Sequence, residues 1–435
     1  MILVDLQIAA RNLAAHTRRN LFLGGALAAV TGLLVLLGAL TSGMEAAMTE
    51  SATTLLTGHV NVGGFYKITG SSTAPLVSEY PKIVELVKKE VRGIDYVTVR
   101  GRGWAKAVSE STSMDLVLAG VEVANEPVFR KVLRISEGRL EDLGQPDTVL
   151  LFEGQAERLK VKVNDVITIS APTARGTNNT ADVRVAAIAK NVGLLSAFSA
   201  FIQGDTLRRL YGLNVTTTGA VHVFLEDPTE ATAVASRLRT AIAAAGWRVM
   251  DPEAQPYWMK LMQTVPAEDW TGQKIDVTTA DDEMGQFKQF ILALRVVTSL
   301  LVVILMVVVV IGILNTLAIA IRERTREIGT LRAIGMQRGK ARWLILLEVT
   351  LLGLAGTVSG ALVAVAIAAG LNAAGIVLPE AAQIFLAQER LTFLLDPRAI
   401  ATQVAFLAAV TVAASIVPAR RAARLKPITA MHHIG

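Results

Sequence analysis

The chain of 435 residues contains no cysteine, and this absence excludes a disulfide-linked scaffold, a thiolate metal centre and a cysteine nucleophile. The five histidines form no HExxH pattern, and there is no GxSxG nucleophile elbow. No stretch fits the phosphate-binding loop GxxxxGKS/T. We therefore expect a chain that is not an enzyme and binds no cofactor or metal itself, so that any ATP hydrolysis takes place in another protein.

Charged residues are also scarce. They make up 18% of the chain, against about 25% in ordinary soluble domains, while 52% of the residues are hydrophobic. This balance excludes a disordered chain and argues against a purely soluble protein. The net charge of +6 is modest, so the positions of the basic residues matter more than their number, and we expect no nucleic-acid partner.

Four segments contain charge-free runs long enough to cross a bilayer, which takes about 20 apolar residues. Because a lipid-exposed backbone must satisfy its own hydrogen bonds, they predict four transmembrane α-helices. The predicted helices occupy residues 21–44, 291–321, 343–375 and 399–418. Residues 1–20 carry apolar side chains at helical spacing, which predicts an amphipathic helix on the cytoplasmic side; a frayed terminus is the alternative.

Basic residues fix the predicted orientation. They cluster before the first helix, between the second and third, and after the fourth, whereas the loop 376–398 has no basic excess. Since basic flanks stay in the cytoplasm, both termini, the connection 322–342 and the tail 419–435 are predicted to be cytoplasmic. The long segment 45–290 and the short loop 376–398 are then extracytoplasmic.

Residues 45–290 have the composition of a globular domain. Strand-like runs alternate with stretches of helical periodicity. The strand-like runs are 96–100, 114–120, 148–151, 165–170, 182–189 and 220–225, and the helical stretches are 81–91, 153–159, 205–211 and 228–245. We predict a large extracytoplasmic α+β domain of two lobes, inserted between transmembrane helices 1 and 2. The polar stretch 174–182 is interpreted as a hairpin tip.

Two clusters in this domain each allow two interpretations. The acidic run 281–283 fits a solvated turn, which is the simpler interpretation, or a calcium site. An aromatic cluster fits either packing at the boundary between domain and membrane, which we favour, or contact with a substrate. Its members are Trp247, Tyr257, Trp258, Met259 and Trp270.

The cytoplasmic connection begins with charges of alternating sign. Arg322 and Arg326 lie one helical turn apart, so they repel rather than stabilise an isolated helix. Ile328, Leu331 and Ile334 form a narrow apolar ridge, and Gly335 is a typical helix stop. The pattern fits a short helix that docks in a groove of a partner or an ordinary basic loop that fixes topology, and the residues alone leave both open.

The segment 322–335, RERTREIGTLRAIG, resembles the signature after the second membrane helix in MacB/LolC/LolE-type (FtsX-like) permeases of ABC transporters. The segment 418–428, PARRAARLKPI, resembles their carboxy-terminal signature. Four membrane helices with a large outer domain between the first two also match that family. One departure is that the glycines often found before the terminal motif are replaced here by Ala413, Ala414 and Ser415.

This resemblance implies a mechanism and partners. The chain would be the permease subunit of a bacterial inner-membrane complex, and its outer domain would resemble the MacB periplasmic core domain. A cytoplasmic ABC ATPase, which holds ATP and Mg, would drive motion of the outer domain (mechanotransmission). Further partners would be a second permease copy, identical or paralogous, and a periplasmic lipoprotein, adaptor or hydrolase. The residues implied to contact the ATPase are Arg322, Glu323, Arg324, Thr325, Arg326, Glu327, Ile328, Gly329, Leu331, Arg332, Ile334 and Gly335.

The resemblance implies extraction of lipoproteins or other amphiphiles, or export of peptides or antibiotics. A regulator of cell-wall hydrolases with the same architecture and an ATP-independent membrane sensor are the alternatives.

Polar and small residues inside the predicted membrane helices are candidates for coupling and packing. Polar groups such as Asn315 and Glu348 usually face protein in a membrane. Glu348 could pair with an arginine of the cytoplasmic connection or extend to the inner interface. Gly353, Gly356 and Gly360 form a small-residue stripe, which we interpret as a helix-packing surface within the permease or its dimer.

Overall fold

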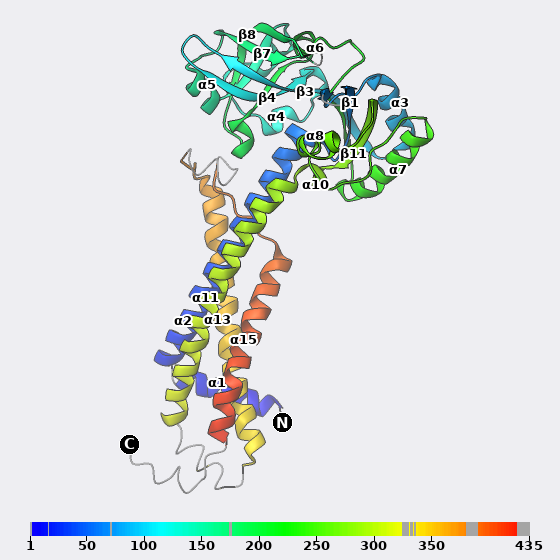
Figure 1. Cartoon of the computed structure of the whole chain (residues 1–435). Helices are drawn as coiled ribbons and strands as arrows, with labels where there is room; N and C mark the ends of the chain where they lie inside the picture. Colours follow the sequence, from blue (N-terminus) through cyan, green and yellow to red (C-terminus); the bar gives the residue numbers. More distant parts are fainter. Residues whose placement is uncertain are drawn as a thin grey trace. The chain divides into compact units, whose positions relative to one another are not determined.

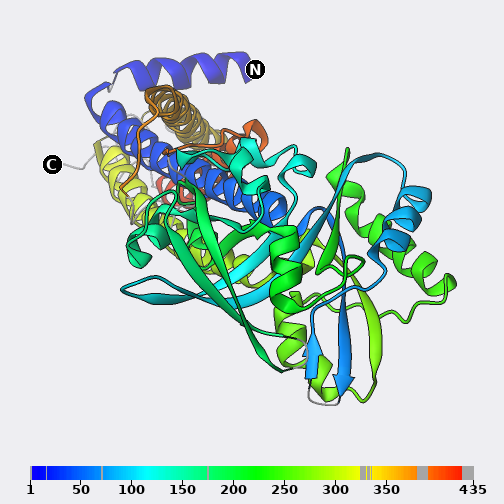
Figure 2. The ribbon, with the colours of Figure 1, turned by 90° about the horizontal axis from the view of Figure 1, so that it is seen from above.

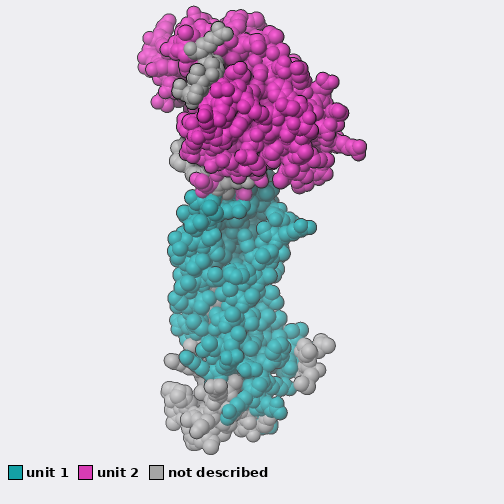
Figure 3. Space-filling view, turned by 45° about the vertical axis from the view of Figure 1, so that its right-hand side comes forward, with its two compact units in different colours: residues 1–44, 292–376, 391–435 teal, residues 45–291, 377–390 magenta. Residues whose placement is uncertain are grey.

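A computed structural model provides the structure of the chain. It describes residues 2–15, 17–69, 72–173, 176–323, 330, 334, 336–379 and 390–423. The chain forms two compact units (Figure 3). Unit 1 comprises residues 1–44, 292–376 and 391–435, and unit 2 comprises residues 45–291 and 377–390.

Long helices build the described part of unit 1 (Figure 1). They are α1 (Ile2–Ala15), α2 (Thr17–Ala52), α11 (Gly285–Glu323), α13 (Arg338–Ala374) and α15 (Pro397–Ala423). Among the described residues, α2, α11, α13 and α15 are long and apolar enough to cross a membrane. The chain thus contains candidate transmembrane helices, while their limits in the bilayer stay predictions.

Two of these helices extend beyond the predicted segments. Helix α2 continues past Met44 to Ala52, because the sequence EAAMTESA contains mostly good helix formers and neither glycine nor proline. Helix α11 begins at Gly285, six residues before the predicted start at residue 291. Both helices therefore contribute residues to unit 1 and to unit 2.

Unit 2 is an α+β domain, as predicted. Its strands are β1 (Val60–Thr69), β2 (Ser72–Ala74), β3 (Ile94–Val108), β4 (Ser113–Val121), β5 (Ile135–Gly138), β6 (Thr148–Phe152), β7 (Val166–Pro172), β8 (Asn178–Ala189), β9 (Ser199–Gln203), β10 (Ala220–Leu225) and β11 (Gly272–Thr279). Its longer helices are α3 (Tyr80–Glu90), α5 (Glu153–Leu159), α6 (Gly204–Tyr211) and α7 (Ala231–Ala244). Its short helical segments are η1 (Thr53–Thr57, a π-helix), η2 (Val123–Asn125), α4 (Phe129–Val132), η3 (Leu140–Gly144), η4 (Gly193–Ala197), η5 (Pro228–Glu230), α8 (Tyr257–Met262), α9 (Thr264–Ala267) and α10 (Ala280–Glu283).

The sheet of unit 2 has two halves that share strand β3. Its order is β11-β1-β10-β3-β4-β9-β6-β8-β5, with β2 beside β1 and β7 beside β3 and β8. We call β11, β1, β10 and the first part of β3 the β1 half, and the remaining strands with the second part of β3 the β4 half. Figure 1 shows the two halves as separate lobes, with α3 and α7 in one and α5 and α6 in the other.

Each half has its own hydrophobic core. In the β1 half, valines of β1 and β10 pack against α3 and α7, with Ile83 and Leu238 fully buried; Figure 2 shows β1 and β11 side by side, in agreement with their antiparallel register. In the β4 half, side chains from β3, β4, β7 and β8 surround Leu118 and Val185, and a second cluster surrounds Phe152 and Phe201. Because each half has its own core, the one domain has two lobes.

The predicted hairpin tip at 174–182 is too long. Strand β8 begins at Asn178 and pairs with β7, with Asn178 opposite Pro172 and Asp182 opposite Thr168. The Thr168 hydroxyl donates to the Asp182 carboxylate at 2.7 Å. The first residues of β8 are polar and exposed, and this composition is also typical of a turn.

Candidate functional site

Four strands of the β1 half carry a buried polar face. Valines and isoleucines face α3 and α7, and polar residues alternate with them on the opposite side of the sheet. Thr278, Asn61, His222 and Thr98 form one cross-strand row, and each is at most 2% exposed. We call this surface the polar sheet face; Arg100, Arg102 and Asp276 also belong to it. Buried polar groups are costly unless they are hydrogen-bonded, so their partners are informative.

Arg100 of β3 binds the segment that follows helix α2. Its Nε and Nη2 donate to the two carboxylate oxygens of Glu126 at 2.6 and 2.7 Å, and Nη2 also donates to the Thr54 carbonyl of η1 at 2.8 Å. Both charged side chains are 2% exposed, and the guanidinium lies 4.9 Å from the centre of the Phe129 ring. A bidentate pair of this kind fixes geometry as well as charge.

Arg102 is connected to the segment that precedes helix α11. Its Nη2 donates to the Asn61 side chain at 3.0 Å, and the Asn61 amide donates to Glu283 of α10 at 3.2 Å. Glu283 also accepts from the Thr278 hydroxyl at 2.8 Å and from the Tyr257 backbone N–H at 3.0 Å. The Arg102 guanidinium lies 4.0 Å from the centre of the Tyr257 ring.

His222 of β10 holds the last turn of η1. Its Nδ1 lies 2.8 Å from the Thr57 carbonyl oxygen, which requires the Nδ1–H tautomer to donate. Burial holds the pKa of His222 well below its usual value, and the positive charges of Arg100 and Arg102 act in the same direction. The ring is therefore neutral at pH 7.

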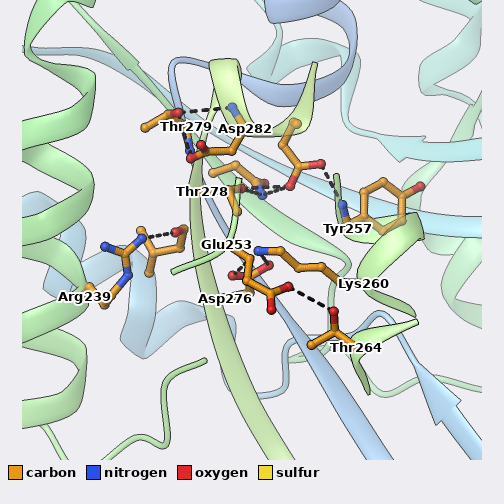
Figure 4. A network of polar contacts seen from close by, with 12 residues as sticks. Arg239, Glu253, Tyr257, Lys260, Thr264, Asp276, Thr278, Thr279 and Asp282 are labelled. Atoms are coloured by element: carbon orange, nitrogen blue, oxygen red, sulfur yellow. Dashed lines mark hydrogen bonds and ion pairs between the residues drawn. The ribbon is translucent and has the colours of Figure 1, made fainter. Parts of the chain in front are cut away.

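A second buried ion pair joins α8 to β11. Lys260 donates to both carboxylate oxygens of Asp276 at 2.9 and 3.0 Å, and the two side chains are 0% and 4% exposed. Burial raises the pKa of Asp276, while Lys260 counteracts this shift. Figure 4 shows Lys260 directed at Asp276, next to the contact between Thr264 and Glu253.

The acidic run 281–283 is not a solvated turn throughout. Glu283 is 8% exposed and hydrogen-bonded in the polar sheet face, and the Asp282 carboxylate accepts from the N–H and the hydroxyl of Thr279 in a capping box. Among the described residues, no group of three or more histidine or acidic side chains is arranged to hold a metal ion.

Part of the aromatic cluster lies in the interior of the domain. Trp270 is 8% exposed and packs with Phe65, Met250 and Val265, and Tyr257 packs against this group. Trp247 packs against the valine core of the β1 half. These three side chains pack within the domain, and contact of the cluster with the membrane boundary or with a substrate stays a prediction.

The predicted ATPase-coupling residues lie mostly outside the described residues. Helix α11 ends with Arg322 and Glu323. Thr330 is helical and its carbonyl accepts from the Ile334 N–H at 3.0 Å, and Ile334 is 80% exposed. The others, which lie outside the described residues, are Arg324, Thr325, Arg326, Glu327, Ile328, Gly329, Leu331, Arg332 and Gly335.

Helix α1 contacts the beginning of α13 through polar side chains. The Asn12 amide donates to the Glu348 carboxylate at 2.5 Å, and Lys340 lies 3.9 Å from Asp5, which is 6% exposed. Glu348 thus has a partner on α1, whereas its predicted pairing with an arginine of the connection stays a prediction. Asn315 lies on α11 and is exposed.

The glycine stripe of α13 lies against α2 and α15. A Cβ atom on Gly356 would lie 2.9 Å from the Gly24 carbonyl oxygen, and one on Gly360 would overlap the backbone of Ala28. A Cβ atom on Gly353 would lie 3.0 Å from Thr411 of α15. Small residues thus allow these helices to approach closely within unit 1.

Sequence reasoning missed the polar sheet face. Its signal is present in VNV at 60–62, TVR at 98–100 and VHV at 221–223. However, the same alternation is typical of a strand with one solvated face. Only the tertiary structure shows that other segments bury these polar side chains.

Comparisons with known proteins match both parts of the chain. Residues 25–241 match the family described as MacB-like periplasmic core domain, and residues 299–427 match the family described as FtsX-like permease C-terminal. Arg100, Arg102 and Asn61 lie in the first matched stretch and Glu348 in the second. Glu283 and Lys260 lie between the two.

Individual relatives cover shorter regions. The chain is 33% identical over 139 residues to the macrolide export ATP-binding/permease protein MacB of Chromobacterium violaceum, which is 32% of this chain and 20% of that protein. It is 32% identical over 151 residues to the probable syringafactin export ATP-binding/permease protein SyfD of Pseudomonas syringae pv. tomato, which is 35% of this chain and 21% of that protein. The chain thus matches about a fifth of the length of these relatives.

A solved structure, the periplasmic region of MacB from Actinobacillus actinomycetemcomitans, is 14% identical and aligns with 52% of this chain and 92% of its own, with a TM-score of 0.31. The two family matches and the apolar helices describe a membrane protein with an extracytoplasmic domain. The chain belongs to the MacB/FtsX-type family of ABC transporter permeases.

Proposed function

We propose that this permease transmits motion from a separate cytoplasmic ABC ATPase to its outer domain. The segment 322–335 receives the motion, and α2 and α11 carry it, because each helix is continuous from unit 1 into unit 2. The ATPase holds ATP and Mg. Both termini lie on the cytoplasmic side of a bacterial inner membrane.

The observation that carries this proposal is the segment RERTREIGTLRAIG. It connects two apolar helices, α11 and α13, and lies inside the stretch that matches the FtsX-like family. Its charges alternate in sign, and the exposed Ile334 offers an apolar contact. A short helix with these features suits a groove in a partner protein.

A second permease copy is part of the proposal. None of the described side chains of α11 between Arg295 and Gly312 is buried. An apolar helix exposed in this way contacts lipid or another membrane helix. A homodimer or a heterodimer would cover part of this surface.

The proposed substrates are amphiphiles, extracted or exported with the help of the outer domain. The names of two relatives, for macrolide export and syringafactin export, support export of such compounds. Lipoproteins, peptides and antibiotics belong to the same proposed range. Regulation of a cell-wall hydrolase through the outer domain, with a periplasmic partner, is the second candidate.

The experiment is charge reversal in the coupling segment. In the double variant Arg324→Glu/Arg326→Glu, ATP turnover of the ATPase that co-purifies with the full chain should fall at least tenfold. The reason is that the introduced glutamates repel those groups of the ATPase that the arginines attract. The measurements are co-purification in mild detergent and ATP turnover in the purified complex.

The matched control is Arg11→Glu/Arg18→Glu. It removes the same positive charge from two exposed positions at the amino-terminal flank, so effects on membrane insertion are comparable. Unchanged co-purification and turnover in the Arg324/Arg326 variant would exclude the proposal. An ATP-independent sensor would co-purify with no nucleotide-binding subunit.

A further inference from the structure

Strand β3 crosses from one half of the sheet to the other between Arg100 and Gly101. Residues 94–100 pair with β10, with Arg100 opposite Ala220, and residues 101–108 pair with β4, with Gly101 opposite Gly120. Arg100 and Arg102 flank this crossing and, two residues apart on a strand, share one face. A force applied at this point acts on both halves.

Both ends of the outer domain are bound at this crossing. Segment η1 directly follows α2, and its Thr54 carbonyl is held by Arg100 at 2.8 Å. Segment α10 precedes α11 by one residue, Met284, and its Glu283 is connected to Arg102 through Asn61. Met284 and Ala52, the last residue of α2, belong to one buried hydrophobic cluster, and α10 contacts η1.

Stability alone does not require these charges. Replacing a buried ion pair by apolar side chains of similar volume is often neutral or stabilising. What apolar side chains cannot reproduce is the fixed direction of the bonds from one guanidinium to Glu126 and Thr54. The two arginines therefore specify where η1 and α10 lie against the sheet.

We propose that Arg100 and Arg102 are positioning residues that connect helices α2 and α11 to both halves of the outer domain. When either helix moves, these contacts carry η1, α10 and the strand common to the two halves along together. This inference rests on the proposed function, because it describes how motion from the membrane helices reaches the outer domain.

The test is hydrogen exchange measured by mass spectrometry on the full chain with its co-purified ATPase. Without nucleotide, the variant Arg100→Met/Glu126→Leu should exchange the amides of residues 53–58 at least tenfold faster than wild type. Arg102→Met should likewise accelerate amide exchange in residues 280–284. If Arg100→Met/Glu126→Leu does not fold, Arg102→Met alone tests whether an arginine at the crossing holds these segments. With ATP, exchange in both sheet halves should change in wild type, whereas Arg100→Met/Glu126→Leu should retain ATP turnover and lose this change.

The matched control is Lys260→Met/Asp276→Leu, which removes the other buried ion pair of the same half. That pair joins α8 to β11, and its two charged groups are hydrogen-bonded to each other rather than to η1 or α10, so exchange at 53–58 and the ATP response should stay as in wild type. Unchanged exchange at 53–58 and 280–284 in the arginine variants, or a retained ATP response in Arg100→Met/Glu126→Leu, would overturn the inference. Absence of any ATP response in wild type would instead refute the proposed function, and the nucleotide-free comparison would still decide the role of the arginines.

Discussion

Helices in unit 1 approach one another through small side chains, whereas strands in the β1 half of unit 2 pack valines on one face and bury charged groups on the other. Gly356 and Gly360 bring α13 against the backbone of α2. Arg100, by contrast, is buried with Glu126, which follows η2, on the sheet face opposite the one that α3 and α7 cover. The two units thus use different means to fix their elements.

The difference follows from the surroundings. Between helices in lipid there is little hydrophobic driving force, so close packing and hydrogen bonds hold them. In water, burial of the valine face supplies about 25 cal/mol per Å², which can offset the cost of burying a hydrogen-bonded charge. Unit 1 should therefore be sensitive to added volume, and unit 2 to changes of charge.

Added volume at the glycine stripe should have the largest effect. Gly360→Leu places a side chain against the backbone of Ala28, which cannot move aside as a flexible side chain can. We expect a loss of about 3 kcal/mol, measured as thermal unfolding of the full chain in detergent. Gly370→Leu is the control, because that position in the same helix has no atom within 4 Å of an added Cβ. Equal melting temperatures of the two variants would contradict glycine packing in unit 1.

Acid should destabilise unit 2 through His222. Its pKa is lowered in the folded state, so the unfolded chain binds the proton more readily. The contribution to stability is complete above the unfolded pKa of about 6.5 and is lost as the pH falls below it. Between pH 7.5 and 5.5 this group should lower the free energy of unfolding by an amount on the order of 1 kcal/mol, measured by denaturant unfolding at both pH values. His222→Gln should lack this component, and equal pH slopes for variant and wild type would argue against it.

The smallest effect is expected at the hairpin between β7 and β8. Four glycine and serine residues inserted between Gly176 and Thr177, which are both exposed, should change stability by less than about 0.5 kcal/mol. The same insertion between Gly58 and His59 should destabilise the domain clearly, because Gly58 has a φ of 65° and its N–H donates to Thr53 of η1. Thermal unfolding of both variants provides the comparison, and equal losses would show that η1 has no special role.

Much of the outer domain is predictable from the sequence. The runs 220–225 and 153–159 coincide with β10 and α5, because apolar clustering and helical periodicity are local properties. Strand β1 was missed, since two glycines in VNVGGFYKIT weaken its strand pattern. Strand β11 was missed because Lys274 and Asp276 interrupt its apolar pattern, although Asp276 is buried against Lys260.

The candidate site was predictable only in part. The coupling segment and the glycine stripe stand out in the sequence because their residues are close together or regularly spaced. The polar sheet face joins residues from 61 to 278, and alternation alone does not distinguish a buried face from a solvated one. Its recognition required the tertiary contacts of Arg100 and Arg102.

The contact between Asn12 and Glu348 has a consequence for biosynthesis. A carboxylate inside a membrane helix is costly to insert without a partner, and Glu348 lies ten residues into α13. Chains are made from the amino terminus, and Asn12 precedes Glu348 by 336 residues. The helix that carries Asn12 therefore leaves the ribosome long before Glu348 is added to the chain. The partner of this acidic group is therefore available when the third apolar helix, α13, enters the bilayer. Removal of α1 should first impair the membrane insertion of α13.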